Sequence, residues 1–203
     1  MKKTLILISF VAFLASCKSV TKTLYGVKNP KIESIASTQK YLVKKGIDTT
    51  NTIIFKDLMS FAIASNTDLL AIPDAMFFNS NGEFVPYKES AESCNADVDS
   101  FLSDLKSINN KETNSSLTLN KLNSLLKHTN GKPLQINRDQ EVYVFITWSK
   151  YAGRINKIKA FAWIDLIEKA KEENLKVKYY LVNCDLQESW EMTDEQIEGL
   201  TES

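Results

Sequence analysis

The sequence lacks a basic excess, a second histidine and any long apolar segment. Lysine and arginine total 25, the same number as aspartate and glutamate, which argues against nucleic-acid binding. With His128 as the one histidine and no carboxylates clustered beside it, no metal-ligand set is predicted. Phosphate-binding, nucleophile-elbow and dinucleotide motifs are also missing. The remaining composition, with 6 glycines, 4 prolines and 43% apolar residues, is typical of an ordinary globular protein, and no cofactor is predicted.

The longest apolar run lies at the N-terminus. It extends from Leu5 to Ala15 after two lysines, and it is shorter than the roughly 20 residues that cross a bilayer. Its length and its charged start are typical of a secretion signal, predicted at residues 1–16. The string Leu14-Ala15-Ser16-Cys17 resembles the lipobox of bacterial lipoproteins. The resemblance implies cleavage before Cys17 and acylation of its thiol, including palmitate; an ordinary signal peptide is the alternative.

Residues 17–28 are polar at first and without periodicity, and we expect them to form a lipidated tether. Neither an aspartate nor an acidic cluster follows Cys17. The expected location is therefore the cell envelope, at the outer membrane and facing the periplasm, with the membrane reached through the lipid anchor. Residues 29–203 are sufficient for one folded domain.

The first half of this domain contains helical and hairpin patterns. A helix is expected to open at Asn29-Pro30 and close at Gly46. Residues 52–55 fit a short strand or the lead-in to a helix at 58–64. A β-hairpin with an Asn-Gly turn is predicted at 75–87, and Pro86 predicts that its second strand lies at a sheet edge.

The second half contains the clearest pattern. Helices are expected at 95–107 and 117–127, with a polar linker at 109–116. A β-rich run at 141–148, a helix at 157–173 and a strand at 177–182 predict a parallel βαβ unit, which occupies residues 141–185.

This unit resembles the centre of a thioredoxin. Trp148 takes the place of the family's strand-end tryptophan, Tyr151 that of the aromatic before the redox motif, and Gly153 that of the motif glycine. Val182-Asn183-Cys184-Asp185 is similar to the end of the next strand in the family.

The redox residues of the family are replaced. Its two motif cysteines correspond to Ala152 and Ile155, and its motif proline to Arg154. The buried aspartate and its lysine neighbour correspond to Ile146 and Leu181. Since disulfide exchange requires a thiolate and a second, resolving thiol, no redox catalysis through this motif is expected.

A second resemblance lies upstream. Ile72-Pro73, the hairpin at 75–87 and the helix at 95–107 resemble the cis-proline, hairpin and final helix of a thioredoxin, although they precede the βαβ unit. We therefore expect an α/β fold, a thioredoxin-like three-layer sandwich in circularly permuted order with extra N-terminal helices. A normal-order fold with an unrelated N-terminal part and a different α/β sandwich are the rivals.

The resemblance implies a peptide-binding groove lined by Trp148, Tyr151, Gly153 and Pro73. The predicted function is that of a non-catalytic, membrane-anchored module that binds a periplasmic peptide or protein. A single-thiol redox protein acting through Cys94, and a purely structural envelope lipoprotein, are the alternatives.

Cys94 and Cys184 are the two cysteines left after lipidation. An oxidising compartment favours a disulfide between them, but thioredoxin sheet order places two strands between their strand ends. Because a disulfide needs Cα atoms within about 7 Å, two free thiols are predicted.

Overall fold

The computed structural model describes residues 24–66, 70–88 and 97–201 of the chain. The signal segment 1–16, Cys17 and Cys94 lie outside these residues. No helix in the described part is long and apolar enough to cross a membrane.

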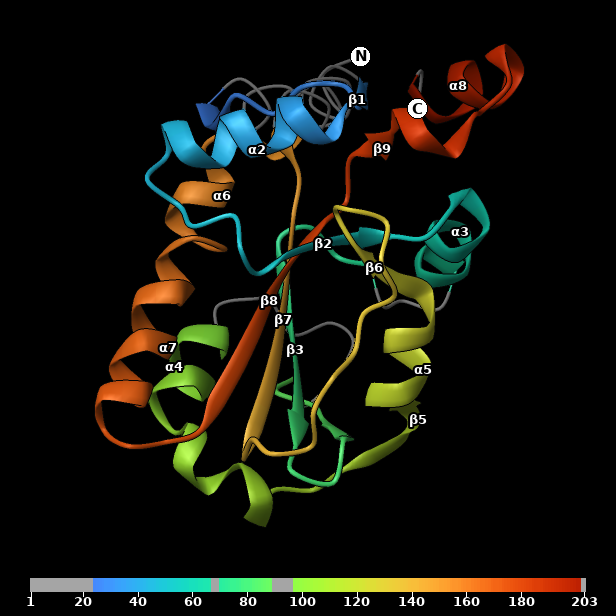
Figure 1. Ribbon diagram of the computed structural model, residues 1–203. Helices are drawn as coiled ribbons and strands as arrows, with labels where there is room; N and C mark the ends of the chain where they lie inside the picture. The colour runs from blue at the N-terminus through green and yellow to red at the C-terminus, as the bar shows by residue number, and fades with distance from the viewer. Residues whose placement is uncertain (1–23, 67–69, 89–96, 202–203) are drawn as a thin grey trace, which may run out of the picture.

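The described strands form one large mixed sheet and one small parallel pair (Figure 1). The large sheet has the order β5-β4-β3-β7-β8-β2-β6, and the small one pairs β1 with β9. The strands are β1 (Ile32–Glu33), β2 (Thr52–Phe55), β3 (Asp74–Asn79), β4 (Glu83–Val85), β5 (Asn114–Thr118), β6 (Leu126–His128), β7 (Val142–Trp148), β8 (Val177–Asn183) and β9 (Leu186–Gln187).

Helices cover both faces of the large sheet, so the architecture is a three-layer α/β sandwich (Figure 1). Helices α2, α4, α6 and α7 lie over one face, and α3 and α5 lie over the other. The helices are α2 (Ile35–Lys44), α3 (Leu58–Asn66), α4 (Asp97–Ser103), α5 (Leu119–Leu125), α6 (Ile155–Ile158), α7 (Ala162–Glu172) and α8 (Asp194–Thr201).

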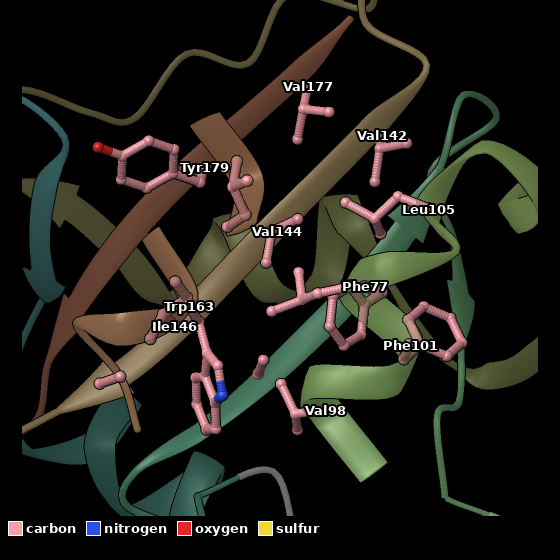
Figure 2. Packing of buried hydrophobic residues seen from close by; sticks show 14 of the residues in the cluster. Phe77, Val98, Phe101, Leu105, Val142, Val144, Ile146, Trp163, Val177 and Tyr179 are labelled. Atoms are coloured by element: carbon pink, nitrogen blue, oxygen red, sulfur yellow. The ribbon is translucent and has the colours of Figure 1, made fainter. Parts of the chain in front are cut away.

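Alternation along the strands builds a separate apolar layer on each face. In β7, Val144 and Ile146 face the layer of α4 and α7, while Tyr143 and Phe145 face the layer of α3 and α5. Figure 2 shows the first layer, in which Trp163 and Phe77 lie with these valine and isoleucine side chains. Since β7 and β8 are buried along almost their whole length, they are the centre of the fold.

The hairpin β3–β4 lies beside the central parallel pair of strands in the sheet. Strands β7 and β3 separate β8 from β4, and the hairpin β3–β4 precedes the β7–α7–β8 unit along the chain. Strands β7 and β8 are parallel, and β3 is antiparallel to β7. The Ile72–Pro73 peptide bond is cis.

Two sequence predictions about the hairpin edge are wrong. The second hairpin strand, β4, is not an edge strand, because β5 pairs with it through Glu83 and Phe84. Pro86 follows the end of β4 and therefore removes no hydrogen bond from this pairing. Residues 114–116, expected in the linker 109–116, belong to β5.

Helix boundaries also differ from those predicted. Helix α2 begins at Ile35 instead of near Asn29, because the Ser34 side chain caps it by accepting a hydrogen bond from the Ser37 N–H at 3.2 Å. Helix α5 ends at Leu125, and the next three residues form β6, so His128 lies in a strand that pairs with β2.

Candidate functional site

The carboxyl ends of the two central strands lie together. Trp148 and Asn183 are paired at the ends of β7 and β8, and the Cys184 N–H donates to the Trp148 carbonyl at 2.8 Å. On the other side of β7, Asp74 pairs with Thr147, which places Pro73 beside this end of the sheet. This region, the carboxyl edge, therefore brings together the strand-end tryptophan and the cis-proline.

The replaced redox positions are apolar. Ile146 pairs with Leu181 across β7 and β8, and both side chains are fully buried. At the motif positions, Ala152 is buried and Ile155 half-buried. No thiol is available at either motif position to attack a disulfide.

Trp148 does not line an open groove. Its side chain is 0% exposed, and its ring stacks on Tyr41 of α2 with centroids 5.8 Å apart. Phe161 covers the tryptophan from another side, also at 5.8 Å. Pro73 is buried as well. Of the four predicted groove residues, Trp148 and Pro73 are therefore buried, Trp148 beneath Tyr41 of α2 and Phe161. Tyr151 and Gly153 are half-buried.

Gly153 is covered by the chain's own N-terminal segment. A Cβ at Gly153 would lie 2.4 Å from the Gly26 carbonyl oxygen and 2.5 Å from that of Tyr25. The φ of Gly153, +61°, is also in the region that favours glycine. Glycine at this position therefore allows a close approach of two backbone segments.

Residues 25–33, here called the covering segment, are hydrogen-bonded to the loop after Trp148. The Lys28 N–H donates to the Tyr151 carbonyl at 2.8 Å, and the Arg154 N–H donates to the Tyr25 carbonyl at 2.7 Å. Ile32 and Glu33 then pair in parallel with Leu186 and Gln187, which continue from β8. Residues 24–28, which were predicted to belong to the tether 17–28, therefore pack on the domain. Residues 17–23 lie outside the described part of the chain.

Lys150 joins the covering segment to the sheet. Its Nζ donates to Glu33 Oε2 at 2.5 Å and to the Ser37 hydroxyl at 2.7 Å. Burial raises the pKa of the Glu33 carboxyl, but the hydrogen bonds from Lys150 and Ser37 outweigh it, so the pKa lies below its usual value. The ion pair is therefore intact at neutral pH.

Asp185 is a buried carboxylate held by several donors. It is 1% exposed. Its oxygens accept the Lys150 backbone N–H at 2.9 and 3.0 Å and the Asn183 Nδ2 at 2.7 Å. Burial nevertheless raises its pKa to about 6, because desolvation of the charge outweighs these hydrogen bonds.

A cavity of about 330 Å³ lies between the covering segment and the carboxyl edge. Three lysines and two carboxylates lie in its wall, and Asn29, Tyr41 and Tyr151 complete it. The charged residues are Lys28, Lys31, Glu33, Lys150 and Asp185. Burial raises the pKa of the Tyr151 hydroxyl, which stays protonated. These groups can bind polar or charged ligand atoms through hydrogen bonds and ion pairs.

Of the predicted site residues, only Tyr151 lines this cavity. Glu33, Tyr41 and Lys150 were not predicted, and no sequence signal joins Glu33 to Lys150 because they are 117 positions apart. Asp185 did have a signal, since the strand ending Asn183-Cys184-Asp185 was already compared with that of the thioredoxins.

Of the two predicted free thiols, the structure describes only Cys184. Cys184 is free and buried, and its thiol donates to the Val182 carbonyl at 3.4 Å. Burial raises the pKa of this thiol, so it is not a reactive thiolate. Cys94 lies outside the described residues. Among the described residues there is no group of three or more side chains that fits a metal ion.

Comparisons of the chain with protein-family models, with curated proteins and with solved structures find no match.

Proposed function

We propose that the chain is a lipid-anchored envelope protein whose domain is a redox-inactive, thioredoxin-like module that binds an extended peptide segment at its carboxyl edge. The observation that carries the proposal is the covering segment. The loop from Ser149 to Arg154 already binds a backbone segment of the chain itself, through the Tyr151 carbonyl and the Arg154 N–H.

The residues around this loop support binding without catalysis. Thr147 Oγ1 accepts the Asp74 N–H at 2.7 Å and donates to the Ala71 carbonyl at 2.6 Å, which fixes the proline loop beside β7. The Ala152 and Ile155 side chains at the motif positions have no nucleophile. The function is therefore recognition, with a partner's segment taking the place of residues 25–33.

The test uses a fluorescent peptide with the sequence of residues 24–34 as the probe. The full chain with Lys28→Pro lacks the N–H that bonds to Tyr151, so its own segment is held less tightly while the loop is unchanged. We expect this variant to bind the probe roughly tenfold more tightly than the unmodified chain, because an attached segment competes at a high effective concentration.

Lys28→Ala is the matched control, since it removes the same side chain but keeps the N–H. It is expected to bind the probe as the unmodified chain does. Absence of probe binding to the Lys28→Pro variant, measured by fluorescence anisotropy, would reject the peptide-binding proposal.

The redox alternative has its own measurement. Reduction of insulin disulfides in the presence of dithiothreitol is expected to stay at background for the full chain, because the exchange needs two thiols. Activity that disappears in Cys94→Ser would instead favour the single-thiol function.

A further inference from the structure

A second cavity, of about 390 Å³, lies near the amino ends of β7 and β8, away from the carboxyl edge. It is on the face that carries α5, where residues 129–141 run as a loop between β6 and β7 (Figure 1). Its volume is within the range of about 300–1,000 Å³ that small-molecule sites occupy. Every residue that lines it has a polar side chain, which is unusual, because ligand sites are mostly apolar.

The wall of this cavity is held in place by its own hydrogen bonds. Tyr143 is fully buried, and its hydroxyl donates to the Asn137 carbonyl at 2.6 Å and accepts the Gln140 N–H at 3.3 Å. Across the cavity, Lys178 Nζ donates to Asn51 Oδ1 at 2.8 Å. The loop is thereby tied to the buried sheet, and the cavity is preformed.

Other polar groups in the wall remain available. Within the described residues, neither the Tyr180 hydroxyl nor the His128 imidazole makes a hydrogen bond, although Tyr180 is only 6% exposed and His128 is half-buried. The Tyr180 ring is fixed by stacking on Phe145, with centroids 5.1 Å apart. These two groups can therefore donate hydrogen bonds to, and accept them from, the polar atoms of a ligand.

The charges of the wall select among polar ligands. Lys178 and Asp139 are its charged residues, and they cancel. The Lys178 ammonium also lies 5.4 Å from the centroid of the Tyr180 ring, where the aromatic face stabilises it. A ligand with a net charge therefore gains little, and the polar groups of the wall favour a ligand that forms hydrogen bonds.

We propose that this cavity binds a neutral saccharide of one or two rings. Its hydroxyls would bond to Tyr180, to His128 and to the amide side chains of Gln135 and Asn137. Amides and hydroxyls both donate and accept, as sugar hydroxyls do, and the cavity volume corresponds to about a dozen water molecules that the sugar would displace.

The test is saturation-transfer NMR with the full chain and a panel of neutral mono- and disaccharides, with and without N-acetyl groups, at millimolar concentration. Glucuronic acid and glucosamine serve as the charged probes. We expect saturation transfer to at least one neutral sugar, and an affinity about three- to tenfold lower in Tyr180→Phe, which removes one hydroxyl and keeps the ring.

Tyr87→Phe is the matched control. The Tyr87 hydroxyl donates to Asp74, and Tyr87 does not line the cavity, so binding should be unchanged. Transfer to none of the neutral sugars, or to the charged probes alone, would overturn the proposal. Equal affinity of the Tyr180→Phe variant would overturn the assignment to this cavity.

Discussion

The Asp185 carboxyl group is almost completely buried. Its pKa in the folded chain, about 6, is above its ordinary value of 3.8. The folded state therefore binds the proton more tightly than the unfolded state, and stability falls as pH rises from about 4 to about 6. Over this range the ionisation of Asp185 costs about 3 kcal/mol of folding free energy.

Asp185→Asn removes this titration. The quantity to compare is the free energy of unfolding of the variant minus that of the unmodified chain, measured by urea denaturation. We expect this difference to rise by about 3 kcal/mol between pH 4 and pH 7. Ionisations shared by both proteins cancel in this comparison.

Asp57→Asn is the control of opposite sign. The Asp57 carboxylate accepts the Ser60 N–H at 2.7 Å, which lowers its pKa, so its contribution is present at neutral pH and lost as pH falls. The unmodified chain should therefore become more stable relative to this variant as pH rises. A pH-independent difference for Asp185→Asn would show that this carboxyl does not titrate as described.

The covering segment lies so close to Gly153 that a side chain there would not fit. Gly153→Ala would place a Cβ against the carbonyls of Tyr25 and Gly26, and these backbone atoms can only move away. We expect the segment to leave the loop, with amide hydrogen exchange in residues 25–33 roughly tenfold faster or more, since two backbone hydrogen bonds are lost.

Gly131→Ala is the control that separates the steric clash of the added Cβ from the backbone strain at positive φ. Gly131 has a similar φ, +82°, but nothing lies within 4 Å of its added Cβ. This variant should lose some stability from backbone strain and leave exchange in the covering segment unchanged. If both variants open the segment equally, the close approach at Gly153 is not what holds it.

Elements with a strong local pattern were predictable. The β-rich runs gave β7 and β8, and the Asn-Gly turn gave the β3–β4 hairpin. By contrast, β5 is polar and mostly exposed, and it is a strand because its backbone pairs with β4. Strand β6 continues a leucine pattern that is equally typical of helix, and its pairing with β2 decides its conformation.

The candidate site was less predictable than the sheet. Trp148 was expected in a groove, since nothing local shows that Tyr41 stacks on it from a helix more than a hundred residues earlier. The cavity beside Tyr180 was not predicted either, because its wall combines residues from four separate segments of the chain, each with unremarkable polar composition.

For the molecule as a whole, the lipid anchor is the proposal with the most direct test. We expect Cys17→Ser to abolish incorporation of radioactive palmitate and to move the protein out of the membrane fraction, because the acyl chains supply the membrane affinity.

Cys184→Ser is the control, since Cys184 is buried in the fold and should not affect labelling. Palmitate label that persists in Cys17→Ser would reject the anchor.

The docking of the covering segment fixes which end of the domain an anchor on Cys17 would bring to the bilayer. From Cys17 to Leu24 the chain spans at most about 25 Å, even when fully extended. The carboxyl edge would therefore face the headgroups, and the acidic helix α8, at the same end of the molecule as β1 (Figure 1), would stand near them. Anionic lipids would repel this helix and tilt the domain, whereas the cavity beside Tyr180 would point outward, away from the membrane surface.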